Sequence, residues 1–174
     1  MGFLTLDELI RSWRGRLKDC DLVVLSACDT QRGIKKGDSM MALPWGFFYA
    51  GAPTVIASLW KVDDTATQLL MTRFYENLLG SFPDARRAVG QEFNAGTAMP
   101  KNLALIEAKT WLRNLTYDER DVTLSAFESS NSDQQKEQDR SIGKTSATAP
   151  RGEGKGPYEH PYYWAAFILI GSPT

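Results

Sequence analysis

Short runs of apolar residues divide the chain and predict its strands. Residues 21–27 and 54–60 each contain consecutive large apolar side chains with β-branched members, a pattern typical of strands buried on both faces. Residues 162–170 form a longer apolar run that stops at Gly171 and Pro173. Strands of this kind belong to sheets that helices cover on both sides.

Between these runs, apolar residues recur at helical spacing. Residues 63–79 place Leu69, Leu70 and Phe74 on one side, with Asp63 or Asp64 as a cap at the start and Gly80 at the end. The same spacing predicts four further helices, at residues 5–13, 42–50, 84–94 and 103–115. Thr5 and Glu8 form a capping box for the first, and Pro44 requires the second to begin near Ala42 or Leu43.

One segment lacks the apolar residues that a folded core needs. Residues 128–157 are rich in Ser, Asp, Gln, Lys, Glu and Gly, and we expect them to form a disordered polar insert because they bury too little surface to offset chain entropy. The remaining order of elements, α-β-α-β-α-α-α-β, predicts an α/β sandwich. Three strands make a thin sheet, so we expect earlier strands of a larger sheet to be missing from the chain.

Composition narrows the classes of function. The 174 residues suit one domain, and 20 basic against 21 acidic residues give a net charge of −1, which argues against binding to nucleic acid through bulk electrostatics. No apolar run reaches the ~18–20 residues of a membrane span, and no signal peptide is visible. Two cysteines without a disulfide framework indicate a reducing, cytoplasmic setting.

A single histidine, His160, limits the possible chemistry further. It excludes a metal site built on several histidines, and any Cys–His mechanism must use His160 or obtain its base from elsewhere. We expect no metal and no cofactor. Cys28 is the candidate nucleophile because it directly follows a predicted buried strand, and ligands of open α/β sheets bind beyond the carboxyl ends of strands. A small buried cysteine at a strand end is the alternative.

Ordered motifs across the chain resemble the CHAT domain, a caspase-like cysteine peptidase family related to separases. The segment LVVLSACDT at residues 22–30 resembles the family's nucleophile strand. Residues 2–8 resemble its opening helix, residues 48–64 its next helix and strand, and residues 111–116 also fit. The closing motif HPYYWAAF occupies residues 160–167. The resemblance covers nearly the whole chain except the polar insert.

The resemblance implies a caspase-like three-layer α/β/α sandwich and a Cys–His dyad. Cys28 stands at the position of the nucleophile, whose backbone amide also belongs to the oxyanion hole. In the family the base follows an earlier strand that ends in His-Gly, and no histidine precedes Cys28 here. We therefore expect residues 1–174 to be the C-terminal portion of a CHAT domain, inactive by itself. An upstream CHAT half, or a partner with tetratricopeptide repeats, would complete it.

Three carboxylates are candidates for substrate binding. Asp64 aligns with the last Asp of the separase segment LWDVTD, and in separases this Asp faces an arginine at the cleavage site. Asp63 is adjacent to Asp64 in sequence, and Asp29 is adjacent to the candidate nucleophile. A carboxylate pairs with guanidinium in a bidentate manner. Asp63 or Asp64 could equally serve as the helix cap, and Asp29 as a loop residue. His160 belongs to the closing motif, where it is either a turn residue or a substitute base.

Two functions follow from these expectations. The first is part of a cysteine endopeptidase that cleaves proteins or peptides after Arg or Lys. The second is a catalytically inactive caspase-like module that binds a protein partner through an unpaired sheet edge. We expect no nucleic acid and no membrane among the partners.

Overall fold

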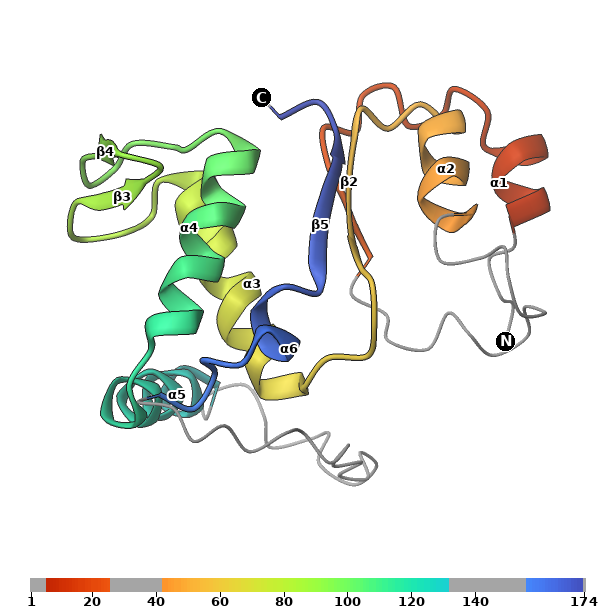
Figure 1. Ribbon diagram of the computed structural model, residues 1–174. Helices are drawn as coiled ribbons and strands as arrows, with labels where there is room; N and C mark the ends of the chain where they lie inside the picture. Colours follow the sequence, from red (N-terminus) through yellow and green to blue (C-terminus); the bar gives the residue numbers. More distant parts are fainter. Residues whose placement is uncertain (1–5, 26–41, 132–155, 174) are drawn as a thin grey trace.

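The computed structural model describes residues 6–25, 42–131 and 156–173, and within them a three-stranded sheet forms the centre of the molecule (Figure 1). Its strands are β1 (Val23–Leu25), β2 (Thr54–Ser58) and β5 (Phe167–Gly171), in the order β1-β2-β5. β1 runs parallel to β2, and β5 runs antiparallel to it. All three predicted strands are confirmed, as is the α/β class.

Helices pack on both faces of this sheet. α1 (Leu6–Ser12) and α2 (Ala42–Tyr49) lie on one face, and α3 (Asp64–Leu79) and α4 (Lys101–Asn114) lie on the other (Figure 1). Successive residues of β2 point to opposite faces, so Val55 joins the core beneath α1 and α2 while Ile56 joins the core beneath α3 and α4. All four helices were predicted from their spacing, although Thr5 of the predicted capping box lies outside the described residues.

The two ends of α3 follow from its sequence. Asp63 caps the first turn, and Gly80 adopts a left-handed conformation with φ 69° at the other end. In α4 the predicted apolar face is buried, including Leu105, Ala108 and Leu112. These predictions are confirmed. The capping residues and the spacing of apolar residues could be read from the sequence because both are local to the helix.

The helix predicted at residues 84–94 is wrong. The chain there forms a β-hairpin of β3 (Arg86–Ala88) and β4 (Gln91–Phe93). Val89 and Gly90 both have positive φ, 51° and 78°, which is the geometry of a two-residue hairpin turn.

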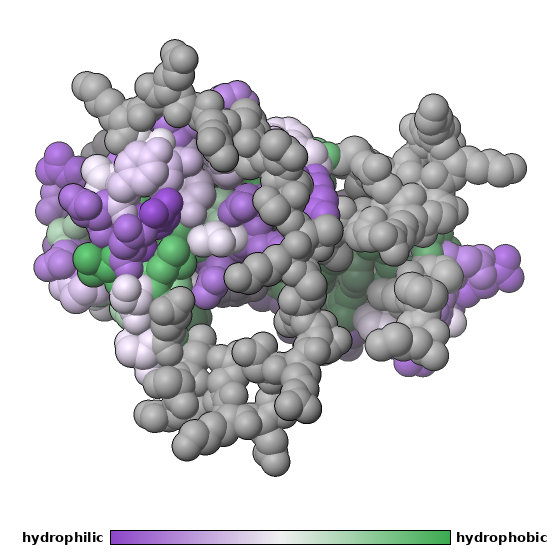
Figure 2. Space-filling view, turned by 90° about the horizontal axis from the view of Figure 1, so that it is seen from below, coloured by the Kyte–Doolittle hydropathy of each residue, from purple (hydrophilic) through white to green (hydrophobic). Residues whose placement is uncertain are grey.

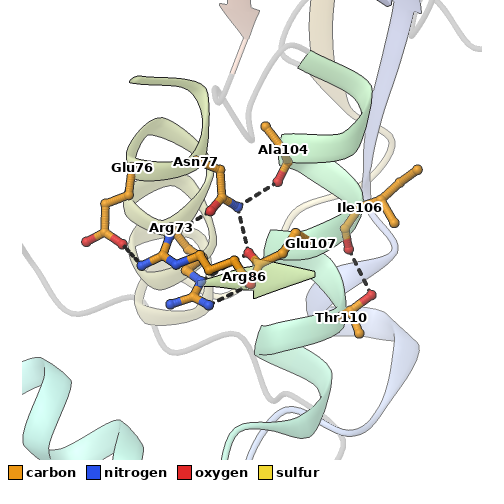
Figure 3. Close-up of polar contacts among 8 residues, drawn as sticks. All are labelled: Arg73, Glu76, Asn77, Arg86, Ala104, Ile106, Glu107 and Thr110. Atoms are coloured by element: carbon orange, nitrogen blue, oxygen red, sulfur yellow. Dashed lines mark hydrogen bonds and ion pairs between the residues drawn. The ribbon is translucent and has the colours of Figure 1, made fainter. Parts of the chain in front are cut away.

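Arg86 ties this hairpin to α3. Its guanidinium donates to the Asn77 side chain and to Glu76, each at 2.6 Å (Figure 3). The Asn77 amide in turn donates to Glu107 of α4 at 2.6 Å, and Arg73 donates to the same carboxylate. These tertiary partners, which the local pattern does not reveal, favour the hairpin over a helix.

A further helix, α5 (Tyr117–Asn131), was not predicted. A capping box begins it: the backbone amide of Thr116 donates to the Glu119 carboxylate at 3.0 Å, and the amide of Glu119 donates to the Thr116 hydroxyl at 3.3 Å. Because α5 continues to Asn131, the predicted insert at residues 128–157 starts too early. Gly156 and Pro157 are described as well, and residues 132–155, the rest of the insert, lie outside the described part.

The strand predicted at residues 162–170 also begins too early. A short helix, α6 (Pro161–Trp164), comes first, and β5 starts at Phe167. His160 caps this helix and Pro161 occupies its first position, a combination that starts a helix and excludes a strand at the same residues.

Candidate functional site

The candidate site lies at the edge of the sheet where β1 and β2 end and β5 begins. Ser58 at the end of β2 pairs with Phe167 at the start of β5, and Leu25 at the end of β1 pairs with Ala57. The parallel strands therefore end on the same side of the molecule, as the nucleophile hypothesis requires. Figure 2 looks onto this side, where the described surface is mostly hydrophilic with smaller apolar areas.

The predicted nucleophile lies outside the described residues. β1 ends at Leu25, and Cys28 and Asp29 follow within the segment at residues 26–41. The structure places the strand that leads to them, and their side chains are not described. Their roles stay predictions.

Asp63 and Asp64 both lie at this edge, and the structure separates their roles. An oxygen of the Asp63 carboxylate accepts the backbone amide of Ala66 at 2.9 Å, which makes Asp63 the helix cap. Asp64 is the first residue of α3 and is exposed. Among the described residues, no hydrogen bond or ion pair engages the Asp64 carboxylate. Of the two, Asp64 is therefore the carboxylate that is available to a ligand.

Two reciprocal hydrogen bonds connect the β2–α3 loop to α6. The indole Nε1 of Trp60 donates to the backbone carbonyl of Tyr162 at 3.0 Å. The hydroxyl of Tyr162 donates to the backbone carbonyl of Lys61 at 2.7 Å. We call this pair of bonds the clasp. It joins segments about a hundred positions apart in the chain, immediately before the two aspartates.

His160 lies next to the clasp and acts as a cap. Its Nδ1 accepts the backbone amide of Tyr162 at 3.2 Å, and the imidazole is exposed. This geometry agrees with the turn-residue interpretation of His160.

Two tyrosines with raised pKa values lie near Asp63. Burial raises the pKa of Tyr158 to about 12, and the negative charge of Asp63 adds to the effect. Burial and the charge of Asp63 also raise the pKa of Tyr163. Their rings pack edge to face with centroids 5.2 Å apart. Both phenols are therefore neutral at physiological pH, and they place two uncharged aromatic side chains near Asp63.

A comparison with protein families decides the identity of the chain. The family model described as the CHAT domain matches residues 1–172. The chain belongs to the CHAT-domain family. The resemblance predicted from the sequence motifs is thereby confirmed, and with it a relation to the caspase-like peptidases. Searches of the curated proteins and of the solved structures gave no match.

Other features of this CHAT chain lie apart from the candidate site. A groove of about 580 Å³ lies between α3, α4 and α5, and none of the predicted site residues lines it. In the described part of the chain no group of His, Cys, Asp and Glu side chains is arranged to hold a metal ion. No described helix has the length and apolar character that crossing a bilayer requires.

Sequence reasoning missed Trp60 and Tyr162 as site residues. Trp60 was interpreted as the end of a strand, and Tyr162 as the beginning of another. The available signal was His160-Pro161, which favours a cap followed by a first helical residue and so places the next aromatic residues on a turn. The hydrogen bonds between the two segments had no sequence signal because their partners are so distant in the chain.

Proposed function

We propose that this CHAT chain supplies the nucleophile-bearing part of a cysteine endopeptidase that cleaves after Arg or Lys. The observation that carries the proposal is the exposed Asp64 carboxylate, which has no partner among the described residues and lies at the edge where the Cys28 strand ends. A carboxylate in that position can pair with a guanidinium or ammonium group of a substrate. Asp29 and the charge of Asp63 would add to the negative potential at this edge of the sheet.

The proposed reaction is acyl transfer through Cys28. The thiolate attacks the peptide carbonyl, and the backbone amide of Cys28 helps to stabilise the oxyanion. The amine leaves with a proton from a histidine, and water then hydrolyses the thioester. Because His160 caps α6, we assign the base to a His-Gly element of an upstream CHAT half.

The wider assignments rest on the same reasoning. We propose that residues 1–174 are the C-terminal portion of a caspase-like sandwich, an assignment that helices on both faces of the sheet support. The polar residues after Asn131 would form an insert within it. The low cysteine count supports a cytoplasmic setting.

One observation favours the second candidate function, a non-catalytic interaction module. Within the described residues β1 pairs with β2 alone, and Val23, Val24 and Leu25 are half-buried although strands of this kind are ordinarily covered on both sides. An unpaired edge of this composition invites another strand. A protein partner, including one with tetratricopeptide repeats, would then bind there without any cleavage.

Reconstitution tests the peptidase proposal. The chain alone is expected to leave an Arg-containing fluorogenic peptide intact, and addition of an upstream fragment that carries His-Gly is expected to start cleavage. Cys28→Ala should abolish this activity. Asp64→Asn should lower kcat/KM for Arg about tenfold or more, while Asp118→Asn, an exposed acid of α5, serves as the matched control. Activity that survives Cys28→Ala would contradict the proposal, and binding of the fragment without cleavage would favour the interaction module.

A further inference from the structure

Hydrogen bonds connect the loop that precedes Asp63 and Asp64 to the segment before β5. The backbone amide of Leu59 donates to the carbonyl of Ala166 at 2.8 Å, which ends the pairing of β2 with the segment before β5. Beyond that point the clasp of Trp60 and Tyr162 links this loop to α6. Asp63 itself bonds within α3.

The clasp acts close to Asp64 in the chain. Its acceptor in the loop is the carbonyl of Lys61, three residues before Asp64. Val62, the next residue, and Ala66 in the first turn of α3 are both buried in the core, so the clasp and this packing together limit where the following carboxylate can lie. The cap at Asp63 limits it from the other side. A residue that holds Tyr162 therefore contributes to the position of Asp64.

His160 is that residue. Its Nδ1 accepts the amide of Tyr162, and its carbonyl accepts the amide of Tyr163 at 3.1 Å. The imidazole thus fixes the first turn of α6, from which both groups of Tyr162 reach the β2–α3 loop. Removing the acceptor would free the turn and, through Tyr162, the loop.

We propose that His160, Tyr162 and Trp60 are positioning residues that orient Asp64 for a basic side chain. The inference rests on the proposed function, in which Asp64 recognises Arg or Lys, and adds what determines that recognition. It gives the single histidine of the chain a role that differs from proton transfer. An acceptor at the position of Nδ1 is required, and an imidazole is not.

Asparagine and alanine at position 160 separate these roles. Asn places its side-chain oxygen where Nδ1 lies and is a favourable cap, whereas Ala has no acceptor. Hydrogen–deuterium exchange of the full chain measures the loop over residues 59–66, and fluorescence anisotropy measures a labelled Arg peptide against the same peptide with neutral citrulline. We expect His160→Ala to raise the exchange rate and to reduce the preference for Arg, each about fivefold. His160→Asn should stay within about twofold of the wild type.

Variants of the clasp itself extend the test. Tyr162→Phe removes the donor to Lys61 and should give the same direction of change in both measurements. Tyr49→Phe removes a hydroxyl from an exposed tyrosine of α2, on the opposite face of the sheet, and should change neither.

The outcomes distinguish this inference from the proposed function. Unchanged hydrogen–deuterium exchange of residues 59–66 in both His160→Ala and Tyr162→Phe would overturn the positioning role of the clasp and leave the peptidase proposal standing. Loss of Arg preference in His160→Asn as large as in His160→Ala would also overturn it, since the acceptor would then not be what matters. A wild-type chain without preference for Arg, or an Asp64→Asn chain that keeps it, would overturn the proposed role of Asp64 and the recognition step built on it.

Discussion

The two faces of the central sheet are packed to very different degrees. On the α3–α4 face, nineteen buried residues form one hydrophobic cluster, and a network of charged and amide side chains joins α3, α4 and the hairpin. On the α1–α2 face the corresponding cluster has four buried residues among those that the structure describes, and Trp45 and Tyr49 of α2 are more than half exposed, at 62% and 52%.

This difference in packing concerns the two parts of the candidate site, Asp64 and the segment that contains Cys28. Asp64 begins α3 and belongs to the heavily packed face. The segment that contains Cys28 joins β1 to α2, and α2 lies on the lightly packed face. Asp64 thus begins a helix of the heavily packed face, whereas α2, which follows the predicted nucleophile in the chain, belongs to the smaller of the two clusters that the described residues form. We expect perturbations of the two faces to differ accordingly.

The largest effect is expected from Glu107→Ala on the heavily packed face. Glu107 is buried and accepts from Arg73 and Asn77. Its removal leaves the partly buried guanidinium of Arg73 without its ion-pair partner and takes one of two acceptors from the buried Asn77 amide (Figure 3). We expect the free energy of unfolding in urea to fall by about 3–5 kcal/mol. Thr110→Ala, at an exposed position one turn further along α4, is the control and should change it little. A loss below about 1 kcal/mol would show that the network does not stabilise this face.

Leucine truncations compare the two faces directly. Leu112 and Leu9 are both fully buried, but Leu112 lies in the cluster of nineteen and Leu9 in the cluster of four. We expect Leu112→Ala to cost about 4 kcal/mol and Leu9→Ala about 2 kcal/mol, because the thinner layer around Leu9 can collapse onto the cavity. Urea unfolding of both variants measures the difference. Equal losses would contradict the contrast between the faces.

Alkaline titration examines the buried phenol of Tyr158 near Asp63. The pKa of Tyr158 is raised from its ordinary value near 10 to about 12. Folding therefore favours the protonated phenol, and the resulting stability is present below pH 10 and lost as the pH rises from 10 to 12. The loss attributable to Tyr158 is about 3 kcal/mol, obtained by subtracting the pH profile of Tyr158→Phe. Identical profiles for the two chains would exclude a raised pKa.

The smallest expected effects separate the two aspartates. Asp63→Ala removes the cap of α3 and should lower the free energy of unfolding by about 1 kcal/mol. Asp64→Ala removes a carboxylate that interacts with the helix dipole alone and should cost about 0.3–0.5 kcal/mol. Asp63→Asn, which retains a capping oxygen, should lie close to the wild type. Equal costs for both alanine variants would contradict the division of roles, and thermal unfolding is precise enough to test it.

Part of the fold was predictable because its signals are local. The three strands of the central sheet, α3 with its end at Gly80, and the family were all predicted from short motifs. The hairpin at Arg86 was not, because it depends on the distant partners Asn77 and Glu76. The helix α6 has a local signal in His160-Pro161 that sequence reasoning missed, whereas the contact of Tyr162 with Lys61 has no such signal. Of the candidate site, the structure brings Asp63, Asp64 and His160 to one edge of the sheet, while Cys28 and Asp29 remain predictions.

The sequence by itself predicted which residues would carry the chemistry, and it places the only histidine in the closing motif. The tertiary structure alone decided how these residues are used. Asp63 and Asp64 are indistinguishable as local caps, and only the folded helix shows which carboxylate meets the amide of Ala66. His160 likewise acquires its role from the turn that it closes and from the distant loop that this turn holds. Hydrogen bonds between remote segments need the assembled fold, because a chain pattern specifies donors and acceptors without specifying which of them meet.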